Sequence, residues 1–324
     1  PIPRVRVLAV FLGFSVSVLL FTSVIPEELA VLIGALLFVD LGGIDVVVAL
    51  NAAIKVIWPN VAARSPVFFG DLVILGFSNP VGSGYINLGV LAVPITIIWI
   101  VGLTNAVNFI DGLDGLAVGV SGIASITMFT IAVLLGENDI AMTMAALAGA
   151  CIGFMPFNMN PAKIFMGDTG AMFLGYMLAT VSIQGLFKVY AVVSFAVPFI
   201  MLGLPIFDTA FAIVRRLMKG QSPMHADRGH VHHKLIDMGF DQKQSVAILY
   251  VLSVVLGLCA VLLTASGEAR IIILVAAVIL SFFIGLSTRL SGMRHTQHTE
   301  QPQAKIHDEA QEEAEDVIPN NEEN

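Results

Sequence analysis

Charged side chains are scarce in this sequence. Of its 324 residues, 12% are charged and 57% are hydrophobic, whereas a soluble domain carries about 25% charged residues. The hydrophobic residues fall into runs close to the length of about 20 that crosses the hydrocarbon core of a bilayer. This composition excludes a soluble globular domain, and the sequence predicts an integral membrane protein.

Cysteine is almost absent as well. The two cysteines, Cys151 and Cys259, both lie inside apolar runs. Their position argues against a disulfide framework or a cysteine-ligated zinc site and indicates small buried hydrophobic residues. The sequence also lacks an internal repeat and a nucleotide-binding strand–loop–helix pattern, and no nucleic-acid partner is expected.

The hydropathy pattern predicts an all-α, polytopic fold of about ten transmembrane helices. The segment 52–70 is the irregular one, because Pro59, Arg64 and Pro66 oppose a membrane helix there. We retain it because the assignment of sides requires an additional crossing. Residues 1–290 then form the transmembrane domain, and the acidic segment 291–324 is expected to be a disordered cytoplasmic tail. The predicted spans are 5–24, 28–44, 52–70, 88–107, 114–136, 139–157, 169–186, 190–214, 244–265 and 270–288.

The distribution of basic residues predicts which side each loop faces. The most basic loop is 215–243, and the positive-inside rule places it in the cytoplasm. Counting crossings from this loop assigns five further segments to the same side. These cytoplasmic segments are 1–4, 45–51, 108–113, 158–168 and the tail after 288.

The first polar motif is Asn105-Ala-Val-Asn108-Phe-Ile-Asp111-Gly-Leu-Asp114-Gly, between two predicted spans. Asp111 and Asp114 are three residues apart and share a face of a helical turn. Two carboxylates and two amides can hold a cation or accept protons from a substrate. The alternative is a local role, since Asp-Gly favours turns and Asp caps helices; a cap, however, needs one such residue.

The second motif is the segment 157–170, which ends in Gly167-Asp168-Thr169-Gly170 before another span. An oxygen-rich turn with one carboxylate suits Mg²⁺, which retains water and shares substrate phosphates. Capping of the following helix by Asp168 or Thr169 is the alternative, and the two roles are compatible.

The third motif, 225–234, contains four histidines together with Asp227, Arg228 and Lys234. Zinc binding lacks a cysteine or acidic partner at the required spacing, so phosphate binding through charge-assisted hydrogen bonds is favoured. A loop that is merely positive would not need the histidines. Asp45, at the end of the second predicted span, is a weaker candidate because a lone aspartate there often caps the helix.

The segments 105–115, 161–170, 205–209 and 230–233 resemble, in order and spacing, those of the polyprenyl-phosphate N-acetylhexosamine-1-phosphate transferases. The form His-Val-His-His resembles the UDP-GlcNAc branch (WecA and TagO type) more than the peptidoglycan translocase branch (MraY type). The resemblance implies transfer of GlcNAc-1-phosphate from UDP-GlcNAc to undecaprenyl phosphate, which yields undecaprenyl-diphospho-GlcNAc and UMP. It further implies Mg²⁺, or Mn²⁺ in its place, a location in the bacterial inner membrane, and a role in teichoic acid, O-antigen or similar polysaccharide synthesis. A homodimer is left open.

The resemblance also implies roles for individual residues. Asp168 is expected to be the metal ligand. The expected catalytic residues are Asp45, Asp111, Asp114, His230, His232 and His233, and the expected substrate-binding residues are Asn105, Asn108, Asn158, Lys163, Phe165 and Arg228.

The N-terminal third departs from the family pattern, because Val46 stands where the family has a second aspartate after Asp45. Four readings therefore stay open beside UDP-GlcNAc transfer: the same chemistry on another UDP-N-acetylhexosamine, the same chemistry on UDP-MurNAc-pentapeptide, an inactive homologue, or a membrane transporter. A transporter would be expected to carry ionisable residues near the middle of the bilayer.

The side assignment can be tested with a cysteine at Ser222, within the basic loop. We expect Ser222→Cys to resist membrane-impermeant thiol reagents in intact cells and to react after the membrane is permeabilised. A cysteine at Glu137, in a loop assigned to the outer side, is the matched control and should react in intact cells. Labelling of Ser222→Cys in intact cells would reverse the topology.

Overall fold

The computed structural model describes residues 7–23, 25–48, 61–78, 85–187, 196–221 and 229–265, all within one compact unit, Pro1–Ile273. Side chains of 41–48 and of 186–187 are outside the description, as are the predicted span 270–288 and the tail. The described elements are α1 (Val7–Phe21), α2 (Pro26–Val48), α4 (Ser65–Phe69), β1 (Gly76–Ser78), β2 (Tyr85–Asn87), η2 (Gly89–Leu91), α5 (Ala92–Ile110), α6 (Leu116–Leu135), α7 (Asn138–Asn158), α8 (Gly167–Ser182), the π-helical turn η3 (Ile183–Phe187), α9 (Ala196–Met201), α10 (Gly203–Met218), α11 (Val231–Asp237) and α12 (Gln242–Thr264).

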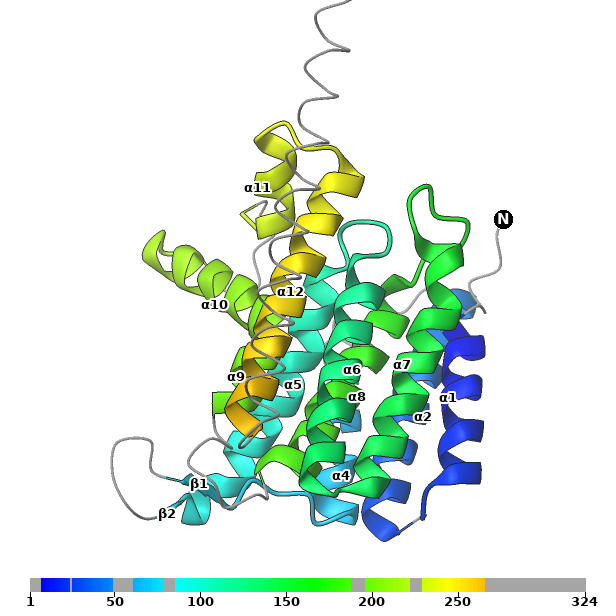
Figure 1. The fold of residues 1–324 in the computed structure, drawn as a ribbon, viewed down its shortest axis with the longest axis vertical. Coiled ribbons are helices and arrows are strands. Elements are labelled where there is room, and N and C mark those ends of the chain that lie inside the picture. Colours follow the sequence, from blue (N-terminus) through cyan, green and yellow to red (C-terminus); the bar gives the residue numbers. More distant parts are fainter. Residues whose placement is uncertain are drawn as a thin grey trace, which may run out of the picture. The chain divides into compact units, whose positions relative to one another are not determined.

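In the part of the chain that the structure describes, four helices are long and apolar enough to cross a membrane. They span Gly89–Ile110, Leu116–Leu135, Asn138–Asn158 and Gln242–Thr264, close to the predicted spans 88–107, 114–136, 139–157 and 244–265. They run side by side in Figure 1 as α5, α6, α7 and α12. The helical fold class is therefore confirmed, while the described residues do not test a total of ten.

The ends of these helices follow from local sequence. Gly115 (φ +81°) and Gly136 (φ +78°) bound α6 in the left-handed conformation that glycine adopts without steric cost. The first turn of α12 has a capping box, in which Asp241 Oδ1 accepts from the backbone N–H of Gln244 (2.7 Å) and Gln244 Oε1 accepts from that of Asp241 (3.0 Å).

Two predicted spans differ from the structure. The prediction of one helix over 190–214 is wrong for its described part, where α9 and α10 are separated at Leu202 and α10 continues to Met218. Pro205 lacks a backbone N–H and cannot continue an uninterrupted helix. The described part of 52–70 contains two helical residues, 61–62, a turn and the short α4, which is followed by β1 paired antiparallel with β2. This small hairpin was not predicted.

The helices pack through aromatic residues and close backbone contacts. Phe173 of α8 lies edge-on to Phe11 and Phe14 of α1, with ring centroids 5.7 and 5.6 Å apart. Tyr176, fully buried on α8, donates to the carbonyl of Val31 on α2 (3.0 Å). Close packing of small residues against neighbouring helices is typical of membrane bundles.

The contact between α8 and α5 leaves no space for a side chain at Gly175. A Cβ there would lie 2.8 Å from Thr104 Cα, a backbone atom that cannot move independently of α5. We expect Gly175→Ala to destabilise the protein by about 1–3 kcal/mol, the usual cost of overpacking, and to lower the thermal midpoint in detergent. Gly149→Ala on α7 is the matched control, because a Cβ there meets nothing within 4 Å. Equal midpoints for both variants would contradict this packing.

Candidate active site

The three polar motifs lie at one end of the helices. Figure 1 shows the α5–α6 connection, the α7–α8 connection and α11 together at its upper end, with the hairpin β1–β2 and α4 at the lower end. This agrees with the prediction that the motifs share a side. Which side of a membrane this end faces remains a prediction.

Asp114 and Asn158 join the first motif to the second. Asp114 Oδ2 accepts from Asn160 Nδ2 (3.0 Å) and from the backbone N–H of Ala162 (3.1 Å). The Asn158 side chain, which is buried, accepts from the backbone N–H of Gly115 (3.2 Å) and donates to the carbonyl of Ile164 (2.8 Å). Both side chains use polar atoms to hold the two loops against each other.

The helix α12 supports the joined loops from a third position. Asn160 Nδ2 also donates to Gln242 Oε1 (2.8 Å), and the Tyr250 hydroxyl donates to the carbonyl of Gly115. A Cβ at Gly119 would collide with the Tyr250 ring. The sequence motifs gave no indication of Gln242 or Tyr250, because both belong to a helix more than eighty residues after the loops that they hold.

Asp111 and Asp168 form the acidic part of the site. Asp111 caps the end of α5, and Asp168 lies in the first turn of α8. Burial and then the neighbouring charges of Asp168 and Asp114 raise the pKa of Asp111 to about 7. The amide oxygen of Asn108 is buried without a hydrogen-bond partner. This part of the site is thus rich in acceptor oxygens, and the electrostatic energy of Asp111 is lowered when it binds a proton or when a cation lies nearby.

The histidine motif contacts the end of α5. The rings of His230 and His232 stack with centroids 5.8 Å apart, and the ring centroids of His232 and His233 are 4.2 Å apart. The His230 ring lies 6.1 Å from Phe109, and a Cβ at Gly112 would collide with the His232 ring. Gly112 therefore allows the histidine segment to lie directly against the acidic loop.

His230 is held by a residue without an expected role. Asp208, buried on α10, has Oδ2 at 2.8 Å from His230 Nδ1, and its Oδ1 accepts from the backbone N–H of Val231 (2.8 Å). Asp208 lies within the segment 205–209 on which the resemblance rests. Its signal in the sequence is a carboxylate inside an apolar stretch, which needs a partner.

His232 has an altered acidity. Burial, and then the neighbouring His233, lower the pKa of His232 to about 4, with Asp208 opposing and His230 adding to the shift. The ring is therefore neutral near pH 7 as the structure stands.

The remaining candidates are more dispersed. Asn105 Nδ2 donates to the carbonyl of Val101 in its own helix (2.7 Å), and Phe165 is exposed. Lys163 lines a cavity of about 740 Å³ between α1 and α7 whose other walls are apolar. The side chain of Asp45 and the whole of Arg228 lie outside the described residues, so their roles stay predictions.

The described side chains do not form a complete set of metal ligands by themselves. Among the described residues, no three His, Cys, Asp or Glu side chains lie together in a way that could hold a metal ion. Mg²⁺ commonly uses one or two carboxylates and takes its other ligands from water and substrate phosphates. The pair of Asp111 and Asp168 fits that mode.

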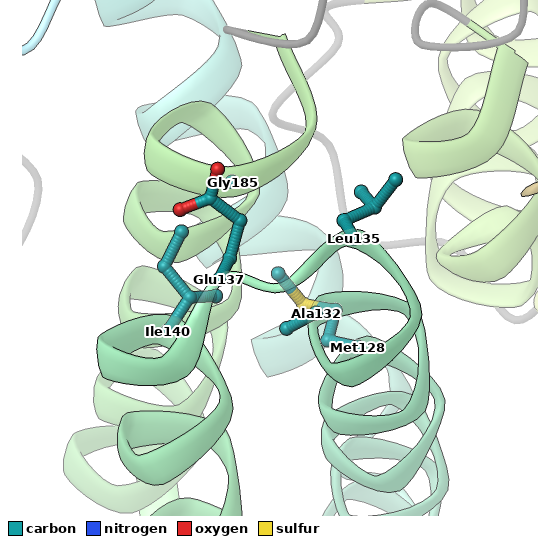
Figure 2. Close-up of a pocket in the computed structure, with 6 residues that line it drawn as sticks. All are labelled: Met128, Ala132, Leu135, Glu137, Ile140 and Gly185. Carbon is teal, nitrogen blue, oxygen red and sulfur yellow. The ribbon is translucent and has the colours of Figure 1, made fainter.

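A small pocket lies at the opposite end, at the turn between α6 and α7. Figure 2 shows its lining residues, among them Met128, Glu137 and Ile140. Its volume of about 10 Å³ is at the lower limit for one water molecule. It is a packing gap and not a substrate site.

Comparisons with known proteins identify a family and several relatives. The model of the family "Glycosyl transferase family 4" matches residues 29–186. The chain is 36% identical, over 81% of its length and 73% of the relative's, to a "Probable undecaprenyl-phosphate N-acetylglucosaminyl 1-phosphate transferase" of Bacillus subtilis. It is 36% identical to a "Decaprenyl-phosphate N-acetylglucosaminephosphotransferase" of Mycolicibacterium smegmatis, over 39% of this chain and 35% of that protein. It is also 28% identical to a "Phospho-N-acetylmuramoyl-pentapeptide-transferase" of Clostridium beijerinckii, over 53% and 51% of the two chains.

The acidity of Asp111 predicts a pH dependence of stability without divalent cations. The folded pKa of about 7 lies above the ordinary value of 3.8, so the folded state binds the proton more tightly than the unfolded state. The stabilising contribution is complete below about pH 4 and is lost as the pH rises through 7. We expect Asp111→Asn to flatten the fall in thermal midpoint between pH 5 and 8. Glu137→Gln, at the opposite end, should leave the wild-type dependence in place; an unchanged dependence in Asp111→Asn would refute the assignment.

Proposed function

The chain belongs to glycosyl transferase family 4, and we propose that it transfers GlcNAc-1-phosphate from UDP-GlcNAc to undecaprenyl phosphate, giving undecaprenyl-diphospho-GlcNAc and UMP. The observation that carries the proposal is the 36% identity, over 81% of the chain, to the Bacillus subtilis protein named as a probable undecaprenyl-phosphate N-acetylglucosaminyl 1-phosphate transferase. The geometry supports it, because the acidic and histidine motifs meet at the ends of membrane-length helices. A water-soluble nucleotide sugar and a lipid phosphate can meet only at such a surface.

The histidine side of the site suits the phosphate groups. The ring centroids of His230 and His232 are 5.8 Å apart, and those of His232 and His233 are 4.2 Å apart. Protonated imidazoles donate charge-assisted hydrogen bonds to phosphate oxygens. A bound diphosphate would favour the charged form of His232, whose pKa is otherwise about 4. Lys163 and Arg228 are the further cations that we assign to substrate binding.

The acidic side suits a magnesium ion. Asp168, with Asp111 beside it, would hold Mg²⁺, and Mn²⁺ is an acceptable substitute for such hard oxygen ligands. When bound, the ion screens the negative charge of the two phosphates that must approach each other. Asp114 and Asn158 keep the loop of Asp111 against the segment that precedes Asp168, so the protein itself fixes the spacing of the carboxylates.

An apolar cavity between two helices that lead to the site supports a lipid acceptor. It has a volume of about 370 Å³ and lies between α5 and α10, with Ile98, Ala106 and Ile206 among its lining residues. Thr209, which also lines it, follows Asp208, the partner of His230. An isoprenoid chain in this cavity would bring its phosphate toward the histidines.

We assign the protein to the bacterial inner membrane with the site on the cytoplasmic side, where the basic loop 215–243 is predicted to lie. The product would then enter synthesis of an envelope polysaccharide such as teichoic acid or O-antigen. The 28% identity to a phospho-N-acetylmuramoyl-pentapeptide-transferase makes a UDP-MurNAc-pentapeptide donor the second candidate. The similarity to this transferase covers less of the chain than the similarity to the Bacillus subtilis protein.

The test is a reconstituted assay with radiolabelled UDP-GlcNAc, undecaprenyl phosphate and Mg²⁺, which follows UMP release and labelled lipid. We expect both products, and none with UDP-MurNAc-pentapeptide as donor. Asp168→Asn should reduce turnover at least about a hundredfold, because a metal contributes several kcal/mol to the transition state. Asp139→Asn, an exposed acid at the start of α7, is the matched control and should keep wild-type turnover. Wild-type turnover by Asp168→Asn at limiting Mg²⁺ would reduce Asp168 to a helix cap, and absence of labelled lipid with every donor would overturn the proposed function.

A further inference from the structure

Asp208 is a carboxylate in an apolar setting whose two oxygens are both occupied. It has 5% exposure and lies within α10. A buried carboxylate is costly unless it is paired and hydrogen-bonded. Here one oxygen meets His230 Nδ1 and the other accepts from the backbone N–H of Val231, each at 2.8 Å. One residue of α10 thus holds both the histidine ring and the first turn of α11.

The chemistry of the pair fixes the state of the imidazole. An ionised carboxylate only accepts hydrogen bonds, so the ring nitrogen that faces it, Nδ1, carries the proton. The other nitrogen, Nε2, then has a free lone pair in the neutral ring and a second N–H in the protonated ring. The backbone contact at Val231 prevents α11 from shifting the ring along the carboxylate.

The surroundings of the ring restrict its orientation further. His230 has 7% exposure, stacks on His232 with an interplanar angle of 11°, and is tilted by 40° against Phe109. A histidine that served only to fill space would not need a buried carboxylate on its inner nitrogen. The arrangement is that of a base or donor whose outer nitrogen is directed by a second residue.

We propose that Asp208 is a positioning residue that fixes the tautomer and orientation of His230, so that Nε2 is presented to the phosphate groups of the substrates. In the neutral ring Nε2 accepts a hydrogen bond from a protonated phosphate; after it takes a proton from solvent, it donates to a phosphate oxygen. Asp208 stabilises the second form without touching the substrate. The inference rests on the proposed function for the identity of the substrates, but not for the Asp208–His230 geometry.

The decisive variant is Asp208→Asn, which keeps the size of the side chain. Its single oxygen can accept from Val231, and its NH₂ group then donates to His230 Nδ1 and moves the ring proton to Nε2. We expect turnover to fall by about a hundredfold to ten-thousandfold, as when the tautomer of other Asp-held histidines is inverted. The KM for UDP-GlcNAc and the thermal midpoint should change little. Asp237→Asn, an exposed acid on α11, is the matched control and should behave as wild type.

A second pair of variants separates positioning from support of the fold. In a His230→Ala background, Asp208→Asn should cause no further loss of turnover, because its effect acts through that ring. His230→Asn keeps a donor toward Asp208 but lacks Nε2, so it should fold normally and still lose turnover. It decides the matter even where Asp208→Asn fails to fold, since wild-type turnover by His230→Asn would overturn the proposal.

A readout that does not need activity distinguishes the two levels of inference. Solid-state NMR of ¹⁵N-histidine-labelled protein in lipid, with His230 assigned by difference from His230→Asn, reports which ring nitrogen is protonated. We expect Nδ1–H in the wild type and Nε2–H in Asp208→Asn. If the wild type transferred no sugar phosphate while these tautomers were found, the proposed function would fail and the Asp208–His230 arrangement would stand. Nε2–H in the neutral wild type, or full turnover of Asp208→Asn with an inverted tautomer, would overturn the positioning role.

Discussion

The hydrogen bonds of Asp114 and Asn158 are the contacts on which the candidate site depends. Asp114 accepts from the 160–162 segment, and Asn158 bonds both to Gly115 and to Ile164. Without them the α5–α6 and α7–α8 connections would lose their direct hydrogen bonds to each other and would depend on the helices that carry them and on the contacts of both with α12. Asp111 follows α5 and Asp168 begins α8, two helices that pack directly on each other, and the loop hydrogen bonds add to this packing in holding the two carboxylates near each other. Asp114 and Asn158, which the sequence predicts to take part in catalysis and substrate binding, can thus contribute to the site by holding its other residues in place.

Hydropathy predicts the long helices well for a physical reason. In the core of a bilayer, the backbone N–H and C=O groups of a spanning segment must form hydrogen bonds within that segment. Apolar runs such as 114–136 and 139–157 are therefore expected to form helices, as α6 and α7 do. The same measure fails over 190–214, because apolarity is continuous there while Pro205 interrupts the hydrogen-bond ladder. It also fails for the hairpin β1–β2, whose pairing depends on partners that a window average does not see.

The sequence predicts which residues belong to the site better than it predicts the contacts and role of each residue. Counting crossings placed the motifs that contain Asp111, Asp114, Asn158 and the histidines on one side, the resemblance implied their roles, and the loops are found at one end of the helices. Spacing does not reveal partners, so the internal bonds of Asn158 were not foreseen. Tyr250 and Asp208 were missed because their partners are 135 and 22 residues away. Contacts over such separations follow from the folded topology; the apolar stretch around Asp208 indicates that its carboxylate needs a partner but does not identify the partner.

The charge states of the site indicate what it is built to receive. On one side the pKa of Asp111 is raised to about 7, because burial and two further carboxylates leave its charge unbalanced. On the other side the pKa of His232 is lowered to about 4, because burial and other imidazoles leave its positive charge unbalanced. Each shift marks a charge that the described residues leave without a balancing opposite charge. A cation near Asp111 would restore that carboxylate to its ionised form, and phosphate oxygens near His232 would restore the imidazolium. A nucleoside diphosphate with a divalent cation, the ligand pair that we propose, carries both charges, whereas a neutral substrate would relieve neither shift.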